Sequence, residues 1–361
     1  MLRRMPVPPF LPTPTRRRLL AAPLLLLPGP ARAVALPEAA PGLSAAWAQF
    51  RGRFMWPEGR VVDTGNGGVS HSEGQGWALL AAERCGDREA FAQLLDWTER
   101  NLHRPQDSLF AWRHVPGARP QATDRNNAAD GDLFIAGALL LAARRWGLPR
   151  YEEQGTAIAR DILRLLLRRV AGRTVLLPGL VGFETAEHVI LNPSYYAFPM
   201  IRLAAQAAPD PAWLRLVADG LGLLRGARFG RWALPPDWLQ LRRADGVASL
   251  PASRPPRFSY DALRVPLYLG WAGLQAEPAG QAVQAFWNDP VHARLPAWAD
   301  LATDSVSPYA ADGGIAALRR WVTWRAQPAG RAAPVAVLEE GDQYYPAMLK
   351  ILTMLAQPVK T

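Results

Sequence analysis

The chain of 361 residues contains a single cysteine, Cys85, and two lysines. One cysteine cannot form a disulfide within the chain or build a cysteine-based metal site. No apolar run reaches the length of about 18 residues that a membrane-spanning helix requires, so we expect no stable membrane insertion. The composition, with 49% hydrophobic and 20% charged residues, is that of a globular protein and excludes a disordered chain.

Acidic residues are missing from the first 33 positions, which hold six arginines and so account for six of the ten net positive charges. Beyond position 33 we find no basic run interleaved with aromatic residues. Such runs are typical of nucleic-acid-binding surfaces, so we expect no nucleic-acid partner. The fourteen tryptophans are many for this length, and exposed tryptophans often line sugar sites.

Residues 1–33 have the order of an export signal. Three arginines at Arg16–Arg18 precede the apolar stretch Leu19–Leu27, and the small-residue segment Ala31–Ala33 follows. The arginines also resemble a twin-arginine signal. The alternative is a basic tail on a cytosolic protein, but the order of segments favours a periplasmic or secreted mature chain that starts near Val34.

After residue 40, apolar residues recur every three or four positions almost throughout, which predicts helices. We expect about twelve: Leu43–Phe54, Glu73–Cys85, Arg88–Leu102, Gly131–Trp146, Tyr151–Val170, Ser194–Ala207, Pro211–Gly226, Tyr260–Gln275, Gly280–Trp287, Ala310–Trp324, Tyr344–Leu355 and a short piece at Pro296–Ala302. Short strands are expected in the irregular stretches Arg173–Glu184 and Gly230–Leu241. Since strands do not alternate with helices, the pattern favours a ring of helical hairpins over a doubly wound sheet.

Acidic residues occur at three junctions between a loop and an apolar helix. In the first, Glu73 follows Ser72, a candidate N-cap, and is close to Gly74 and Gly76. A structural explanation is that Glu73 interacts favourably with the helix dipole. However, glycines lower helix propensity at these positions, and they would let a polysaccharide approach the backbone closely.

The other two motifs are weaker. Asp130 or Asp132 is a candidate N-cap, and Asp261 is three residues from Arg264, the spacing of a local ion pair. If the three acidic motifs converge at one end of a helical ring, they would suit glycoside hydrolysis. That reaction needs one acid to protonate the leaving oxygen and one carboxylate to attack the sugar or activate water.

The sequence resembles glycoside hydrolase family 8 in four segments: DTGNGGVSHSEGQGWALL, NNAADGDLFIAGALLLA, NPSYYAFP and SYDALRVPLYLGW. The closest likeness is to the endo-β-1,4-glucanases encoded with bacterial cellulose synthases, and it runs from about Trp47 to the Tyr344–Tyr345 region. The resemblance implies an all-α (α/α)6 barrel formed by a single catalytic domain, residues 34–361. It also implies an endo-acting, inverting hydrolase of β-1,4-glucosidic bonds in cellulose.

The resemblance assigns roles to individual residues. Glu73 matches the general acid, Asp261 the general base, and Asp130 an aspartate that holds and distorts the sugar at the cleavage subsite. Further residues are expected to bind substrate: Arg264, Tyr195, Trp112, Tyr260 and Gln75. A buried core tryptophan explains Trp112 equally well. Inversion predicts that the carboxyl groups of Glu73 and Asp261 lie about 6.5–9.5 Å apart, with a water between them.

The expected chemistry requires no cofactor and no catalytic metal. The expected partner is a β-1,4-glucan, with the cellulose synthase complex as a further one, and we expect a monomer. Two alternatives remain open: a catalytically inactive protein that binds and guides nascent glucan, and a chitosanase, xylanase or lichenase of the same family. The chain departs from the family pattern at Trp77 and Ala129, which bears on sugar stacking and the preferred chain length.

Overall fold

The computed structural model describes residues 40–118, 124–327 and 331–357. All of them belong to one compact unit, Pro37–Thr361. The predicted export signal, residues 1–33, lies outside the described residues. None of the helices in the described ranges is long and apolar enough to cross a membrane.

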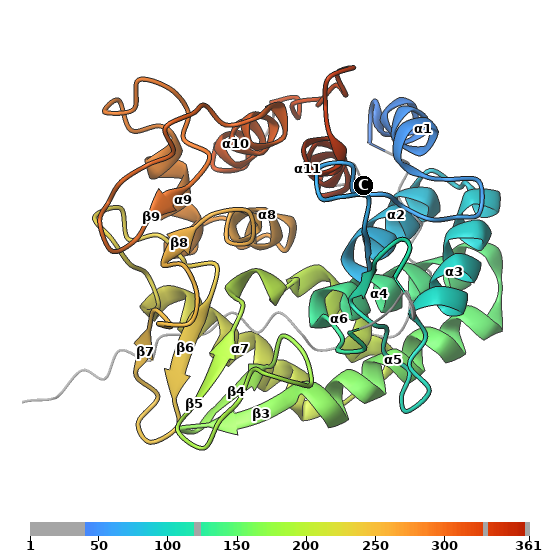
Figure 1. The fold of residues 1–361 in the computed structure, drawn as a ribbon, viewed down its shortest axis with the longest axis horizontal. Coiled ribbons are helices and arrows are strands. Elements are labelled where there is room, and N and C mark those ends of the chain that lie inside the picture. Colours follow the sequence, from blue (N-terminus) through green and yellow to red (C-terminus); the bar gives the residue numbers. More distant parts are fainter. Residues whose placement is uncertain (1–39, 119–123, 328–330, 358–361) are drawn as a thin grey trace, which may run out of the picture. The chain divides into compact units, whose positions relative to one another are not determined.

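The described part of the chain contains eleven α-helices, against the expected number of about twelve (Figure 1). They are α1 (Leu43–Phe54), α2 (Ser72–Arg84), α3 (Arg88–Leu102), α4 (Ala129–Trp146), α5 (Pro149–Leu166), α6 (Phe198–Ala207), α7 (Pro211–Gly226), α8 (Arg264–Trp271), α9 (Pro278–Trp287), α10 (Gly313–Arg325) and α11 (Tyr344–Leu355). A short 3₁₀ turn, η1 (Pro193–Tyr195), precedes α6.

The helices alternate along the chain between an inner and an outer environment. α2, α4, α8 and α11 are buried along most of their length. α5 and α7 instead bury one stripe of side chains spaced three or four residues apart, as amphipathic helices do. α2 packs against α3 and α4, and α4 packs in turn against α5 and α6. Each buried helix is therefore covered by a neighbour in the chain that faces solvent.

The two ends of the described chain meet, which closes the arrangement. α11 packs against both α1 and α2, and Figure 1 shows α1 and α11 close together although they are the first and last helices. The apolar side chains between the helices form one continuous core cluster. This closure brings residues from the start and the end of the chain to the same place, which matters for the site described below.

In the described ranges, nine short strands lie in the connections and pair antiparallel in four small sheets: β1–β2, β3–β4, β5–β6–β7 and β8–β9. Their bounds are β1 (Ser70–His71), β2 (Arg113–His114), β3 (Leu167–Val170), β4 (Arg173–Leu176), β5 (His188–Leu191), β6 (Leu239–Arg242), β7 (Ala248–Ser249), β8 (Arg257–Phe258) and β9 (Ala299–Asp300). The strands expected in the stretches 173–184 and 230–241 are present as β4 and β6.

Several expected helices differ in the structure. The helix expected from Ser194 is α6 from Phe198, after η1, and the one expected from Ala310 is α10 from Gly313. The helix expected to reach Val170 ends at Leu166, because a two-residue turn with positive φ at Ala171 (45°) and Gly172 (80°) folds the chain back as the β3–β4 hairpin. The piece Pro296–Ala302 is not a helix and contributes β9 instead. α8 begins at Arg264 rather than Tyr260, since the preceding residues form a turn.

Candidate active site

Glu73 lies in the first turn of α2, directly after strand β1. The backbone N–H of Ser72 donates to the carbonyl of Trp112 at 3.0 Å, and β1 pairs with β2, so this strand pair fixes where α2 starts. The N-cap residue is His71, one position before the expected Ser72. The Glu73 carboxyl is thereby held at the positive end of the helix dipole.

The glycines near Glu73 serve helix packing. A Cβ on Gly76 would lie 3.1 Å from the main chain of α4, and a Cβ on Gly131 would lie 2.8 Å from the backbone nitrogen of Glu73. A Cβ on Gly74 would collide with a tyrosine hydroxyl of α11. Protein atoms therefore fill the space that we expected to be open to a polysaccharide, and that expectation is wrong. Close packing of α2 on α4 instead makes Glu73 and Asp130 neighbours.

Asp130 and Asp132 both open α4 but have different surroundings. The side chain of Asp130 is 2% exposed, its Oδ2 lies 3.8 Å from Arg264 Nη2, and its charge raises the pKa of Glu73. Asp132 accepts hydrogen bonds from the backbone N–H of Phe110 at 2.9 Å and the side-chain amide of Asn127 at 2.7 Å. Asp132 thus ties two loops to the helix, while Asp130 belongs to the acidic cluster.

Asp261 lies in the turn between β8 and α8, three residues before Arg264. Its side chain is 32% exposed, and that of Glu73 is 22% exposed. Both carboxyl groups therefore reach solvent, although they come from distant segments of the chain. Exposure of this kind is what a carboxylate needs if it is to meet a polymer or a water molecule.

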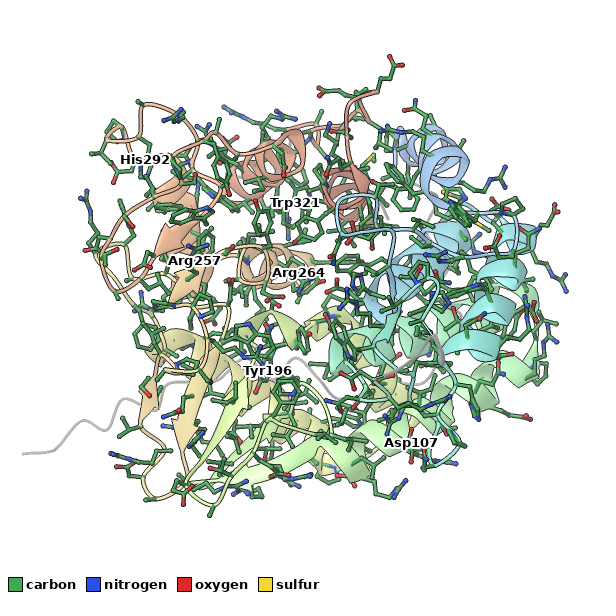
Figure 2. All side chains as sticks on the ribbon, in the orientation of Figure 1. Asp107, Tyr196, Arg257, Arg264, His292 and Trp321 are labelled. Carbon is green, nitrogen blue, oxygen red and sulfur yellow. The ribbon has the colours of Figure 1, made fainter. Side chains whose placement is uncertain are left out.

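Arg264, the first residue of α8 (labelled in Figure 2), brings the three carboxyl groups together. Its Nη1 donates to Glu73, and its Nη2 donates to Asp261 Oδ1 at 2.9 Å. The same Nη2 lies 3.8 Å from Asp130 Oδ2 and donates to Ser194 Oγ at 3.1 Å. The Arg264 side chain is 3% exposed, so this cation is almost fully withdrawn from water and stabilised by its acidic partners.

Burial raises the pKa of all three acids. The pKa of Glu73 lies well above its usual value because of burial; Arg264 opposes the shift and Asp130 adds to it. For Asp261, burial raises the pKa, Arg264 again lowers it and Glu73 raises it. The pKa of Asp130 is also raised by burial. Glu73 therefore tends to keep its proton beside a second acid, an environment suited to a general acid.

Aromatic side chains surround the cluster. Tyr195 follows Ser194, whose hydroxyl accepts from Arg264, and burial followed by the charges of Asp130 and Asp261 raises the pKa of Tyr195 well above its usual value. Tyr260 is 42% exposed, and its carbonyl accepts a hydrogen bond from the hydroxyl of Tyr345. These rings give the site partly exposed apolar surfaces of the type on which sugars stack.

Trp112 is partly exposed, so the alternative of a buried core residue is wrong. Its indole ring stacks on the imidazole of His71 at a centroid distance of 5.9 Å, and its Nε1 donates to Asp124 at 2.8 Å. These contacts hold the ring beside His71, which is the N-cap of α2 and two residues before Glu73. Substrate contact by Trp112 stays a prediction.

Gln75 does not lie where a substrate-binding residue should. Its side chain is fully buried, and its Oε1 accepts from the backbone N–H of Val61 at 2.7 Å. Its Nε2 donates to Thr98 Oγ1 at 2.9 Å and to the carbonyls of Gly59 and Leu94 at 3.2 and 3.3 Å. The amide is therefore committed to protein partners, and the prediction that Gln75 binds substrate is corrected to a structural role.

Three residues of this region were missed by the sequence reasoning. Ser194 contacts Arg264 and is next to Tyr195 in the NPSYYAFP segment, so its place in that segment could have predicted a role in the site. Tyr345 stands at the end of the family resemblance but was given no role, and Asp237 had no signal. Tyr345 reaches the site because α11 closes onto α2, and Asp237 reaches it from the loop that leads into β6.

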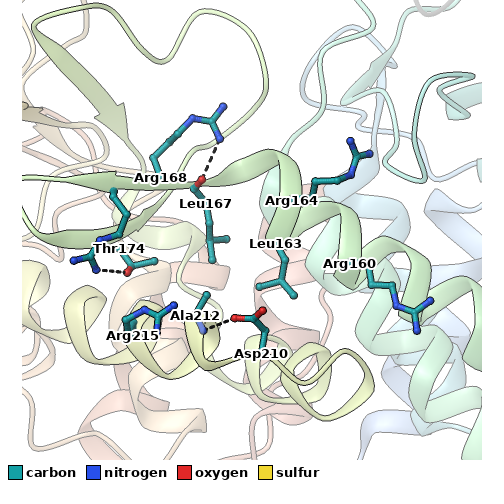
Figure 3. Close-up of a pocket in the computed structure, with 10 residues that line it drawn as sticks. Arg160, Leu163, Arg164, Leu167, Arg168, Thr174, Asp210, Ala212 and Arg215 are labelled. Atoms are coloured by element: carbon teal, nitrogen blue, oxygen red, sulfur yellow. Dashed lines mark hydrogen bonds between the residues drawn. The ribbon is translucent and has the colours of Figure 1, made fainter.

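A separate cavity of about 390 Å³ opens between α5, β3 and α7 (Figure 3). Five arginines line it together with apolar and polar side chains: Arg160, Leu163, Arg164, Leu167, Arg168, Arg169, Thr174, Asp210, Ala212 and Arg215. It shares no residue with the acidic cluster. Arginines are suited to anions rather than to an uncharged sugar, so this cavity is not the place for glycoside chemistry.

Known proteins similar to this chain have related sequences and folds. The family model described as glycosyl hydrolases family 8 matches residues 31–358. A probable endoglucanase of Novacetimonas hansenii is 42% identical over 315 residues, which are 87% of this chain and 91% of the relative. An endoglucanase of Cellulomonas uda is also 42% identical, over 76% of each chain.

The solved structure of the endo-β-1,4-glucanase CMCax from Acetobacter xylinum superposes with a TM-score of 0.81 at 43% identity. The match covers 87% of this chain and 97% of that chain. The predicted fold class is confirmed: the alternating inner and outer helices match the (α/α)6 barrel.

Proposed function

Because the chain belongs to glycosyl hydrolases family 8, we propose that it is an inverting endo-β-1,4-glucanase with Glu73 as general acid and Asp261 as general base. The observation that carries the proposal is the meeting of Glu73, Asp130 and Asp261 around the guanidinium of Arg264. The endoglucanases of Novacetimonas hansenii and Cellulomonas uda, each 42% identical, support the substrate class.

Glu73 supplies the proton to the glycosidic oxygen. A carboxylic acid does this only if it is still protonated at the working pH, and burial raises the pKa of Glu73 while Asp130 adds to the shift. As the bond to the anomeric carbon breaks, the departing sugar takes the proton and Glu73 becomes a carboxylate. Arg264 then stabilises the new charge, because its Nη1 already donates to this carboxyl group.

Asp261 takes the proton of the attacking water. Arg264 Nη2 donates to one oxygen of Asp261, and the exposed part of the side chain can meet water. The water adds to the anomeric carbon on the face opposite the departing oxygen, so the β-configuration of the bond becomes α in the product. The cycle closes when Asp261 releases its proton to solvent and Glu73 takes up a proton from solvent.

Asp130 holds the sugar between these two groups. Its carboxyl is 2% exposed, but unlike the fully bonded amide of Gln75 it lies beside the partly exposed Glu73. Its Oδ1 accepts from the backbone N–H of Gly131 and its Oδ2 is 3.8 Å from Arg264; we propose that it accepts hydrogen bonds from sugar hydroxyl groups there. Bonds that strengthen as the ring distorts lower the barrier, because they favour the transition state over the bound substrate. Tyr195, Tyr260 and Trp112 are proposed as stacking surfaces along the glucan.

The function is tested with carboxymethyl-cellulose and with soluble cello-oligosaccharides. An endo-acting enzyme lowers the viscosity of the polymer early, when few reducing ends have formed. Proton NMR during the first minutes of oligosaccharide hydrolysis should show the α-anomer at the new reducing end. Initial release of the β-anomer would contradict inversion, and a lack of new reducing ends would contradict hydrolysis.

The alternative of a catalytically inactive glucan-binding protein leaves the acid pair unexplained, since binding an uncharged polymer requires neither a protonated acid nor a buried carboxyl cluster. The substrate alternatives within the family are chitosan, xylan and mixed-linkage glucan. A panel of these soluble polysaccharides alongside carboxymethyl-cellulose separates them, and we expect the highest kcat/KM on the β-1,4-glucan.

We also propose that the enzyme acts outside the cytoplasm, together with the cellulose synthase complex. The support for export is the Arg16–Arg18 and Leu19–Leu27 pattern, and the support for the synthase is the resemblance to enzymes encoded beside it. Fractionation of cells that carry the full chain or residues 34–361 tests the first point. Co-purification with the synthase tests the second.

A further inference from the structure

Asp237 is a buried carboxyl behind the proposed general base. It lies two residues before strand β6, and the residue is 9% exposed. Its Oδ1 accepts hydrogen bonds from the backbone N–H groups of Ser259 and Ala262, both at 2.8 Å. These two donors lie on either side of Asp261 in the sequence, so one oxygen atom fastens the turn that carries the base.

The backbone around Asp237 adds a third tie to the same segment. Its N–H donates to the carbonyl of Arg257 at 2.7 Å, and Arg257 belongs to β8, which pairs with β9. At the other side, β6 is the central strand of the β5–β6–β7 sheet. Asp237 is therefore anchored next to the β5–β6–β7 sheet and hydrogen-bonded to β8 of the β8–β9 sheet. These two attachments give the turn that carries Asp261 a rigid support.

The two N–H groups need this acceptor. Ser259 is 6% exposed and Ala262 is 0% exposed, and a buried N–H without a partner costs about 1–3 kcal/mol. Within the described residues the N-cap position of α8, Leu263, makes no side-chain cap hydrogen bond. Asp237, from a distant segment, accepts the hydrogen bonds of the backbone N–H groups in the turn before α8. A capping residue does the same for the first N–H groups of its own helix.

The charge state of Asp237 fits this role. Burial, followed by the charge of Asp261, raises the pKa of Asp237 to about 8, and Arg264 opposes the shift. The raised pKa favours the protonated form of Asp237, which adds little negative charge beside Asp261. A neutral acceptor is sufficient to hold the turn.

We propose that Asp237 is a positioning residue for the reaction: by holding the backbone on both sides of Asp261, it sets where the carboxylate of the base meets the attacking water. The proposal rests on the proposed role of Asp261. The proposed role affects the activation barrier of the reaction and not the affinity for the glucan, because the hydrogen bonds of Asp237 run to the main chain of the turn.

The test compares the variants Asp237→Ala and Asp237→Asn with wild type on a soluble cello-oligosaccharide. Removal of the acceptor should lower kcat about 10²-fold, the cost of a small displacement of a reacting group, while KM stays within about twofold. Asp237→Asn keeps an oxygen acceptor, so kcat should recover to within about fivefold of wild type. The acid limb of its pH profile, where Asp237 is uncharged in wild type, should superimpose on that of wild type.

Asp219→Ala is the matched control. Asp219 also accepts a backbone N–H bond, from Thr174 at 2.6 Å, but on the β4–α7 side of the molecule. Its loss should lower the melting temperature without lowering kcat. Thermal unfolding of every variant separates loss of fold from loss of positioning. If Asp237→Ala does not fold, Asp237→Glu, which keeps a carboxyl but lengthens the side chain, should fold and lower kcat in the same way.

Three results would overturn the proposal: full kcat in folded Asp237→Ala, an Asp237→Asn variant as slow as Asp237→Ala, or a loss confined to KM. Asp261→Asn, measured in parallel, keeps the two proposals distinguishable. If Asp261→Asn is fully active, the role of the base itself is wrong. If Asp261→Asn is inactive but Asp237→Ala is not impaired, the positioning role alone fails.

Discussion

Glu73 and Asp261 accept hydrogen bonds from the two terminal nitrogens of the same guanidinium, that of Arg264. A planar, rigid cation is well suited to this task, because its two nitrogens are fixed relative to each other. The acid from α2 and the base from the turn before α8 are thus linked through one side chain. Any shift of Arg264 changes both carboxyl groups at once, in position and in pKa.

Replacing either carboxyl group should nearly abolish hydrolysis. Glu73→Gln cannot donate the proton, and Asp261→Asn cannot accept one, so each should lower kcat on carboxymethyl-cellulose by about 10²–10⁴-fold. Both amides are close in size to the acids and the fold should survive, which circular dichroism and thermal unfolding can verify.

Asp96→Asn is the control for this pair of variants. The side chain of Asp96 is 65% exposed and pairs with Arg100 on the surface of α3, so its replacement should leave kcat unchanged. Full activity in Glu73→Gln or in Asp261→Asn would remove that residue from the mechanism.

Asp130→Asn should move the alkaline limb of the pH profile to lower pH. Burial raises the pKa of Glu73 first, Arg264 lowers it, and the charge and hydrogen bond of Asp130 raise it further. The amide removes this negative charge but leaves burial in place. The pKa of Glu73 then falls, and the acid loses its proton at a lower pH than in wild type.

The measurement is kcat/KM against pH, since its alkaline limb reports the pKa of the essential acid in the free enzyme. A drop in kcat is expected as well, because Asp130 is proposed to hold the sugar. An alkaline limb that stays in place or moves upward would show that Asp130 does not act on Glu73 electrostatically.

Arg264→Met should shift the whole pH profile to higher pH. Arg264 lowers the pKa of Glu73, Asp261 and Asp130, so each pKa rises when the cation is lost. Asp261 must be ionised to act, and the acid limb therefore moves up; Glu73 must be protonated, and the alkaline limb moves up too. Loss of the cation from a buried cluster should also cost about 3–5 kcal/mol of stability where the acids remain charged.

Arg264→Lys gives a second, sharper comparison. Lysine keeps the charge, but its single ammonium group does not have the fork that binds Glu73 and Asp261 together. The pH profile should therefore stay closer to that of wild type than in Arg264→Met, while kcat remains low. Equal kcat in Arg264→Lys and wild type would show that the charge alone suffices.

The fold and the acid residues could be predicted because they depend on local signals. Helical periodicity placed α1, α3, α7 and α11 at the bounds found in the structure, and the Gly-rich motif pointed to Glu73. The hairpin after Leu166 was missed because its turn signal, Gly172, was outweighed by a run of apolar residues. Contacts made by closure of the barrel, such as those of Tyr345 and Asp237, depend on distant segments and leave no local signal.

Gln75 shows why motif membership does not determine a role. It is two residues from Glu73 in the same motif, yet one turn of helix is 3.6 residues, so positions two apart face nearly opposite sides. Glu73 faces the cluster, and Gln75 faces the interior between α2 and α3, where Thr98 and the carbonyl of Leu94 bind its amide.

Gln75→Leu should therefore destabilise the protein without weakening substrate binding. Leucine fills a similar volume but leaves the buried N–H of Val61 without its acceptor, at a cost of about 1–3 kcal/mol. We expect a lower melting temperature and denaturant midpoint, with KM within about twofold of wild type for the folded fraction. The exposed Gln206, which contacts Arg144 on the surface, provides the control Gln206→Leu with unchanged stability. A large rise in KM for Gln75→Leu at full stability would instead restore Gln75 to the substrate site.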